Sequence, residues 1–312
     1  MNVKANAGLG FEGRFSITAR NPDGSIRLIR EFKNLITDLG LNGIGTNGTA
    51  WSTLIGLGTG TATPSVSDTS LSGTVISVTG GTGSSGAVTS SPRYDWGRWT
   101  RTFAQGAATG VWTEIGIGRT TSTLWSRALI LDGGGSQTSL TIVATDILTV
   151  EYELRVYYNE SDVTGTKTIS GVSTSYIVRP YQQSVSTPGK VLGGTWMSGP
   201  SISTRPGLLA YNGALNAAWA GPGGTSVGGF GSSTPYTVAA YVNNSFQKVS
   251  TYTADISNMN LAGGLTVVAP ILWGDYFDGG HSAFKFGFTP AIAKDNTKIL
   301  SLTFSYTWAR RP

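Results

Sequence analysis

The sequence predicts an all-β protein made of two tandem, jelly-roll-like β-sandwich domains, with one short docked helix near residues 34–44. Apolar and polar residues alternate with period two in many short segments, which is typical of strands with one buried face. The composition, with 44 glycines, suits a chain with many tight turns. A length of 312 residues exceeds the roughly 250–300 residues at which a single core stops growing. We therefore predict an N-terminal attachment β-sandwich at 1–160 and a C-terminal β-sandwich, exposed or distal, at 161–312.

The first half opens with a hairpin. In RFSITAR, Phe15, Ile17 and Ala19 fall on one face of a strand. The NPDG sequence that follows is typical of a type I turn, and SIRLIREF at 25–32 returns as the partner strand. The segment 74–91 is expected to begin as a strand and to end in a flexible Gly/Ser tip. Further strands are predicted within 51–60, 94–103, 111–119, 123–131, 139–146 and 147–158.

Two of these strands carry specific predictions about their faces. The segment ILTVEYELRVYY at 147–158 should bury one row and turn the other toward solvent or a neighbouring strand. The expected buried row is Leu148, Val150, Tyr152, Leu154 and Val156. A shared face is also expected for Val111, Thr113, Ile115 and Ile117.

The segment REFKNLITDLGLNGIGT at 30–46 is the one helical pattern in the chain. Asn34 can cap a helix that begins at Leu35 and Ile36, and Gly40 or Gly43 can end it. A helix this short has no stability of its own, because the cost of nucleation exceeds the gain from its few hydrogen bonds. We therefore expect it to dock on a sheet, as a plug over the open end of a sandwich.

The second half begins after a predicted linker at 159–171 and contains a long exposed loop at 213–235. The segments ILTVEYELRV at 147–156 and ILSLTFSYTW at 299–308 match in pattern, and each closes its half. Either the chain is a duplicated sandwich or the two segments are alike because both enter a core. Strands are predicted at 174–181, 236–242, 247–256, 265–273, 283–288 and 298–308.

Charge and composition bear on the partners. Charged residues make up 12% of the chain, and the net charge of +5 comes from basic residues that are scattered singly. We therefore expect no nucleic-acid partner, because phosphate binding needs clustered Lys and Arg. We expect no membrane insertion and no cleaved signal, since no apolar run approaches the length of a membrane span. Low charge together with many aromatic residues suits surfaces that become buried against copies of the chain or against other partners.

The sequence shows no recognisable catalytic motif, whether nucleophile elbow, phosphate-binding loop or zinc-protease helix, so we expect no enzyme activity and no cofactor. Asp275, Asp278 and His281 are spaced by three and could bind a metal, but only on a helix that Gly279 and Gly280 disfavour. An ordinary loop is the preferred interpretation of these residues.

Aromatic residues are the better candidates for binding. Trp96, Trp99, Trp112 and Trp125 lie in strand patterns, so we expect them in the core. Four others lie in or beside Gly-rich loops, where they can anchor a ligand or an interface, or pin the loops to the sandwich. These are Trp196, Trp219, Trp273 and Tyr276.

The order of several phrases in residues 14–158 resembles a family of bacteriophage tail and tail-fibre-associated structural proteins. The phrases are FKNLITDLGLNGIG, GLGTGTATPSVSDTSL, RTFAQGAATGVWTEIGIG, LWSRALI and DILTVEYELRVYY. The second half matches no family pattern. The resemblance implies a virion structural protein of the tail fibre, baseplate or collar, without enzyme activity and made in the host cytoplasm.

On this basis we expect a closed homo-oligomer, a trimer or higher, in contact with other tail proteins and contributing to host attachment. The alternative is a receptor-binding protein that recognises host surface polysaccharide through loops of the C-terminal domain. A tail-borne depolymerase is a third hypothesis, and it is disfavoured because the sequence lacks the fixed-period repeat of a long β-helix.

Overall fold

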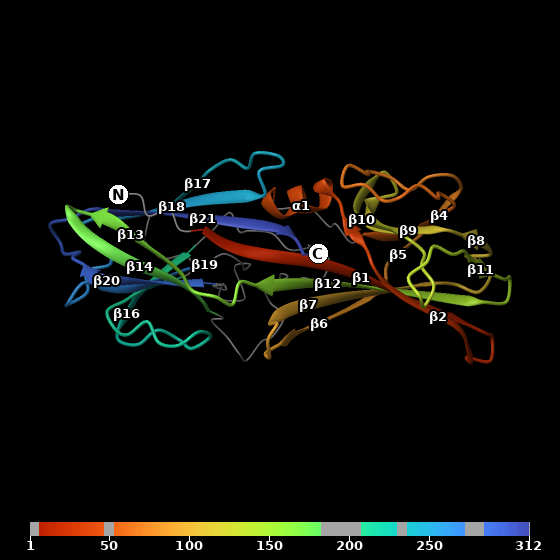
Figure 1. Cartoon of the computed structure of the whole chain (residues 1–312), viewed down its shortest axis with the longest axis horizontal. Helices are drawn as coiled ribbons and strands as arrows, with labels where there is room; N and C mark the ends of the chain where they lie inside the picture. The colour runs from red at the N-terminus through yellow and green to blue at the C-terminus, as the bar shows by residue number, and fades with distance from the viewer. Residues whose placement is uncertain (1–5, 47–52, 182–206, 230–235, 272–283, 312) are drawn as a thin grey trace.

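A computed structural model describes residues 6–46, 53–181, 207–229, 236–271 and 284–311 (Figure 1). Of the residues in these ranges, 57% are in strands and 3% in a helix, so the prediction of an all-β fold with one short helix is confirmed. In Figure 1 the strands of the first half lie on the right and most of those of the second half on the left.

The largest sheet has eight strands and draws on both halves of the chain. Its order is β17-β18-β21-β1-β12-β7-β6, and β2 also pairs with β1. The bounds are β1 Asn6–Arg20, β2 Ile26–Lys33, β6 Thr82–Val88, β7 Tyr94–Phe103, β12 Ile147–Tyr158, β17 Tyr236–Val238, β18 Gln247–Ala254 and β21 Leu300–Arg310.

Each half adds a sheet of its own. In the first half a five-stranded sheet has the order β3-β10-β9-β4-β5, beside a two-stranded sheet of β8 and β11. Their bounds are β3 Leu35–Ile36, β4 Leu54–Gly58, β5 Val75–Thr79, β8 Gly110–Trp112, β9 Glu114–Thr120, β10 Thr123–Leu129 and β11 Leu140–Ile142. In the second half a six-stranded sheet has the order β13-β14-β20-β19-β15-β16. Its bounds are β13 Val163–Ile169, β14 Val172–Pro180, β15 Gly207–Tyr211, β16 Ser226–Gly229, β19 Leu265–Ile271 and β20 Phe284–Ile292.

Strand β1 connects the two halves. Its residues 9–20 pair antiparallel with β12, and its other edge is divided between two partners. Residues 6–11 pair parallel with 305–310 of β21, and residues 14–20 pair antiparallel with β2. One sheet therefore crosses the predicted domain boundary at 160/161, and the boundary itself stays a prediction.

The core forms between the shared sheet and the sheet that each half adds. The predicted row on β12 is confirmed, because all five side chains are fully buried. In the second half the rings of Phe286 on β20 and Phe304 on β21 lie 4.7 Å apart, which joins the six-stranded sheet to the shared one. In this way the shared sheet acts as one layer of both sandwiches.

The helix differs from its prediction. Helix α1 spans Asp38–Gly45, and its N-cap is Thr37, whose side chain accepts a hydrogen bond from the Gly40 amide at 3.0 Å. Leu35 and Ile36 form β3 instead of the first helical turn. The Asn34 amide group lies against Gly13, where an added Cβ would come within 2.3 Å of its oxygen. Pairing of Leu35 and Ile36 with β10 holds those residues extended, so the helix begins only after Thr37.

Two segments, one predicted as a linker and one as a flexible tip, contain strands. The predicted linker at 159–171 contains β13, which pairs with β14 along its whole length. The predicted Gly/Ser tip contains β6, because Gly80 and Gly81 adopt φ of 77° and 105° and turn the chain back onto β7. Backbone pairing, which needs no apolar side chain, is what orders both segments.

Two side chains, those of Val111 and Trp96, are more exposed than their strand patterns predicted. Val111 is 53% exposed, whereas Ile115 and Ile117 are fully buried, because residue 113 lies between β8 and β9 and breaks the alternation. Trp99, Trp112 and Trp125 are buried as predicted. Trp96 is only half-buried, because it projects from the opposite face of β7 to Trp99.

The two segments with similar patterns flank the same strand. Strand β12 lies on one side of β1 and runs antiparallel to it, while β21 lies on the other side and runs parallel to it. Whether the halves are a true duplication stays a prediction.

Candidate functional site

Among the predicted site residues, Trp219 lies in the loop that follows β15. Its ring meets the Tyr158 ring edge-on, with centroids 5.5 Å apart, and the Arg93 guanidinium lies 4.5 Å from its centroid. Its amide donates to the Pro180 carbonyl at 3.1 Å, which helps to hold the residue at a φ of 68°. Trp219 therefore pins its loop to the end of β12, and a ligand role stays a prediction.

The other predicted site residues lie outside the described residues. These are Trp196, Trp273, Tyr276, Asp275, Asp278 and His281. Within the described ranges, no three His, Cys, Asp or Glu side chains gather in a way that could hold a metal ion. Over the same ranges, no helix has the length and apolar character to cross a membrane.

A buried ion-pair network joins three of the phrases that carry the family resemblance. Glu114 at the start of β9 is fully buried, and its Oε2 accepts from Arg127 Nε of β10 at 2.6 Å. Its Oε1 accepts from the backbone amide of Ser72 at 2.6 Å and from that of Gly60 at 3.3 Å. The carboxylate thus ties both ends of the loop between β4 and β5 to the five-stranded sheet.

Arg127 extends the network into the middle of the same loop. Its Nη1 donates to Asp68 at 2.6 Å, and its Nη2 donates to the Ala62 carbonyl at 2.9 Å. All three donor nitrogens of the guanidinium are engaged, an arrangement for which a lysine has too few fixed donors. Sequence analysis did not identify this network, although the phrases containing its residues could have indicated it.

Helix α1 joins the two halves. On the first half, Thr37 Oγ1 donates to the Leu124 carbonyl at 2.8 Å, and the Asp38 amide donates to the Val66 carbonyl at 2.7 Å. On the second half, Trp308 Nε1 donates to the Leu41 carbonyl at 2.9 Å and Lys248 Nζ to the Gly45 carbonyl at 3.0 Å. Figure 1 shows α1 between β18 and β10.

Asn42 on α1 completes this joint. Its Oδ1 accepts from the Tyr241 hydroxyl at 2.6 Å and from the Asn244 amide at 2.7 Å. Its Nδ2 donates to Asn244 Oδ1 at 2.8 Å. The prediction of a plug on one sandwich is therefore corrected: both halves bind the helix, which satisfies polar groups near its C-terminal end.

Buried lysines organise the second half, and sequence analysis did not identify them. Lys285 on β20 is fully buried, and its Nζ donates to the carbonyls of Ala217 and Ala220, each at 2.7 Å, and of Asn216 at 3.3 Å. Burial, together with the nearby charge of Arg179, lowers the pKa of Lys285 to about 8. The ammonium group holds the loop that contains Trp219, and it leaves no motif because its partners are backbone atoms.

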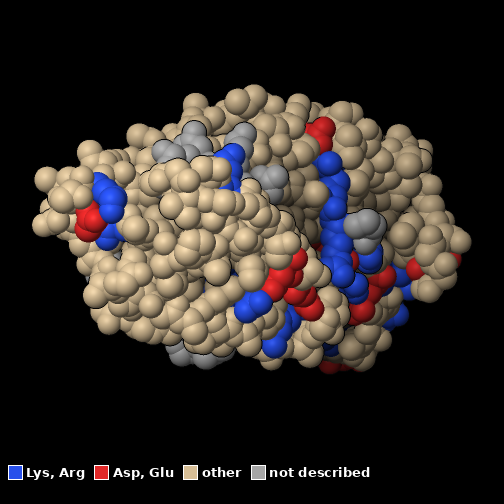
Figure 2. All heavy atoms as spheres, turned by 60° about the vertical axis from the view of Figure 1, so that its left-hand side comes forward, with Lys and Arg blue, Asp and Glu red and all other residues tan. Residues whose placement is uncertain are grey.

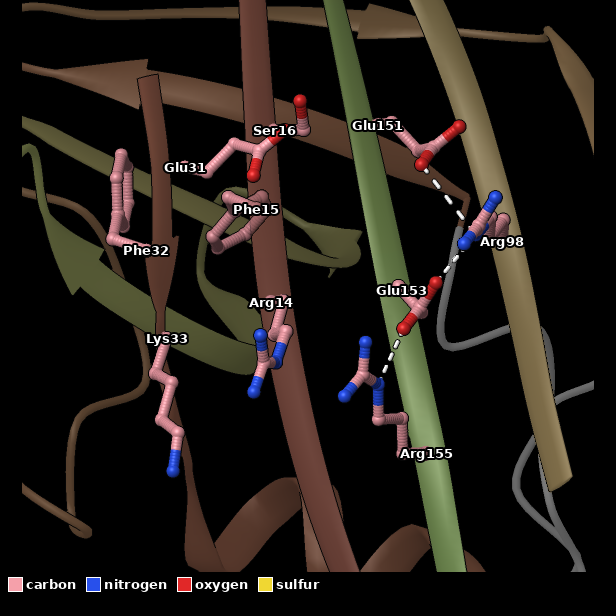
Figure 3. Close-up of a pocket in the computed structure, with 10 residues that line it drawn as sticks. All are labelled: Arg14, Phe15, Ser16, Glu31, Phe32, Lys33, Arg98, Glu151, Glu153 and Arg155. Carbon is pink, nitrogen blue, oxygen red and sulfur yellow. Dashed lines mark hydrogen bonds and ion pairs between the residues drawn. The ribbon is translucent and has the colours of Figure 1, made fainter. Parts of the chain in front are cut away.

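The outer face of the shared sheet carries a charged ladder across β2, β1, β12 and β7 (Figure 3). Glu153 of β12 accepts from Arg98 of β7 and from Arg155 of its own strand. Arg98 also lies 3.6 Å from Glu151. These side chains border a hollow of about 380 Å³. The ladder residues are Glu12, Arg14, Lys33, Arg98, Glu151, Glu153 and Arg155.

Glu12 is a carboxylate of this ladder that is held in its ionised form. Burial alone would raise the pKa of Glu12, but hydrogen bonds from Arg14 and Lys33 hold it below the usual value. The Arg14 and Lys33 nitrogens lie 2.7 and 3.2 Å from its oxygens. The carboxylate is kept ionised and paired, which stabilises the sheet face and does not prepare Glu12 to donate a proton as a general acid.

No protein-family model, no curated protein and no solved structure matches the chain. The geometry described here is therefore the basis for a functional proposal, together with the phrases that resemble tail proteins. Its main features are a first half with a buried ion-pair network, a helix bound by both halves, and a long shared sheet with an ion-paired outer face.

Proposed function

We propose that the chain is a non-enzymatic structural protein of a bacteriophage tail, located in the virion and assembling with copies of itself and with other tail proteins. One observation carries the proposal. Three charged residues, Asp68, Glu114 and Arg127, each from a different one of the resembling phrases, form one buried ion-pair framework. A segment whose charged groups are engaged in this way supports shape and attachment, which is what a tail component requires.

The surface is consistent with assembly. In the view of Figure 2, Lys, Arg, Asp and Glu gather in a few mixed groups separated by broad uncharged surface. Charged residues are depleted in the cores of protein interfaces, because each unpaired charge would lose its hydration there. A surface of this kind suits burial against protein partners.

The test is immunogold labelling of phage particles from cells that carry the encoding sequence, with an antibody raised against the purified chain. The proposal expects gold confined to the tails, and pre-immune serum provides the control. Gold on heads, or protein found only outside the particles, would contradict it.

The alternative, recognition of host polysaccharide by the C-terminal domain, depends on Trp219, Trp273 or Tyr276, of which Trp273 and Tyr276 lie outside the described residues. Trp219 is engaged by Tyr158 and Arg93. A glycan array probed with the intact chain distinguishes the two, since binding abolished by Trp273→Ala would favour the alternative.

A further inference from the structure

The first half has two long edge strands of opposite character. Strand β2 carries Arg27, Arg30, Glu31 and Lys33 among its eight residues. Charged side chains on an edge strand discourage other chains from pairing with it. Strand β6 has no such protection, because residues 69–92 contain no Lys, Arg, Asp, Glu or His.

The unprotected edge extends over both sheets of the first half. Strand β6 ends the shared sheet and β5 ends the five-stranded sheet, and only Gly80 and Gly81 separate them. Among the described strands β6 is paired only with β7 and β5 only with β4. All seven residues of β6 are exposed or half-buried. In Figure 1, β6 runs along the lower edge of the molecule.

A tryptophan and an arginine lie beside this edge on the outer face. Trp96 pairs with Gly86 across the β6–β7 ladder, and its indole covers that glycine, where an added Cβ would come within 2.5 Å of the ring. The Arg98 guanidinium lies 4.4 Å from the ring centroid. Trp and Arg are the residue types most enriched in the energetic centres of protein interfaces. This placement also gives a role to the one first-half tryptophan that was wrongly predicted to be in the core.

We propose that β6 pairs antiparallel with β6 of a second copy, so that the two shared sheets become continuous across a two-fold axis. The inference rests on the proposed function in one respect, that the chain assembles with copies of itself. A two-fold contact is self-complementary, so an edge whose charges were all of one sign would face charges of that same sign. The lack of charge over 69–92 removes that repulsion, and the small side chains let two backbones approach. The contact joins copies in pairs, so a larger ring requires a second contact elsewhere.

Two-fold symmetry restricts the register in which β6 can pair with its copy. Side chains directly opposite one another in an antiparallel pair lie on the same face of the sheet, so only residues of the same parity can oppose each other. A two-fold pairing of β6 with itself must therefore place one residue against its own counterpart. Opposite Cα atoms lie about 4.5–5.5 Å apart, which is within disulfide range.

The first test uses the absence of cysteine from the chain. Each residue from Thr82 to Val88 is replaced in turn by Cys, with Ile29→Cys on β2 as the matched control, since Ile29 is 49% exposed. After mild oxidation, the proposal expects a disulfide-linked dimer to peak at one β6 position and to be weak at Ile29. Equal cross-linking at Ile29, or none at any β6 position, would overturn it.

The second test measures mass by light scattering. The parent chain should be an even-numbered oligomer, and Ser84→Lys should halve the mass and raise the dissociation constant by at least about tenfold through like-charge repulsion. Ile29→Lys should keep the parent mass, and circular dichroism should show both variants folded. A parent that is monomeric at micromolar concentration or odd-numbered, or a Ser84→Lys variant of unchanged mass, would overturn the pairing.

Gold labelling of the tails with no cross-linking through β6 would refute the pairing and leave the proposed function intact. Cross-linking through β6 without tail labelling would refute the proposed function and leave the pairing intact.

Discussion

The two halves of the molecule accommodate buried charge in different ways. In the first half the buried cation Arg127 is matched by the carboxylates of Glu114 and Asp68. In the second half the buried cations Lys285 and Lys248 donate to neutral carbonyl oxygens. The first arrangement requires particular side chains at fixed places, whereas the second requires a lysine and a backbone of the right shape.

We propose that this difference accounts for the resemblance to tail proteins that the sequence predicts for the first half alone. Matched side chains place constraints on residue type in several segments at once, so they appear as phrases. Carbonyl partners place a constraint on one lysine alone, and the loop around it is free to differ in sequence.

The substitution with the largest expected effect on stability is Arg127→Met in the first half. We expect a loss of about 3–5 kcal/mol in the free energy of unfolding, because Glu114 would be left as a buried charge without its cation. Urea denaturation followed by circular dichroism measures it. Arg98→Met is the control, since Arg98 is 41% exposed and its ion pairs should contribute no more than about 1 kcal/mol. Equal losses in the two variants would show that burial of the network is not what matters.

In the second half the corresponding change is Lys285→Met. It removes the donor shared by three carbonyls, and we expect a loss of about 2–3 kcal/mol, smaller than for Arg127 because no charge is left unpaired. The Trp219 loop should become more sensitive to protease. Lys298→Met, which breaks an exposed pair with Asp295, should change stability by less than about 0.5 kcal/mol. A protected loop in Lys285→Met would contradict the role of the ammonium group.

Asp95 is a buried acid of the first half whose carboxylate accepts from a neutral donor, the Tyr158 hydroxyl, at 2.6 Å. Burial raises the pKa of Asp95 to about 6, despite the hydrogen bond from Tyr158. The folded protein therefore binds this proton more tightly than the unfolded chain does. As a result, the free energy of unfolding is highest below the pKa of the unfolded chain and falls as pH rises through the pKa of the folded protein. Relative to Asp95→Asn, the parent should therefore lose about 2 kcal/mol between pH 4 and pH 7. Parallel stability curves for the two proteins would refute this.

The smallest expected effect concerns the joint between the halves. Asn42→Ala removes three hydrogen bonds between α1 and the second half, and we expect a loss of about 1–2 kcal/mol. Asn21→Ala in the exposed first turn is the control and should cost no more than about 0.5 kcal/mol. Calorimetry should also show a less cooperative transition for Asn42→Ala, and an unchanged single transition would argue against the joint.

Sequence reasoning succeeded where side chains alone decide the structure. The alternation in β12 predicted its buried row, because each apolar residue there meets the core. It failed for β6 and β13, whose order comes from backbone pairing with a neighbour. It also placed the helix start too early, since the pairing of Leu35 and Ile36 with β10 is a long-range contact. For Lys285 the partners are carbonyls of a distant loop, which no local pattern reveals.

The division of β1 between two partners has a consequence for the order of folding. Residues 6–11 pair with 305–310, a separation of roughly 300 residues, whereas residues 14–20 can pair with β2 almost at once. Closing so long a loop is slow and entropically costly. The first sandwich can therefore form during synthesis, while residues 6–11 of β1 still lack β21 as their partner on one edge. Until β21 arrives, that stretch of β1 presents open backbone groups, and during this interval the newly made chain is most exposed to mispairing.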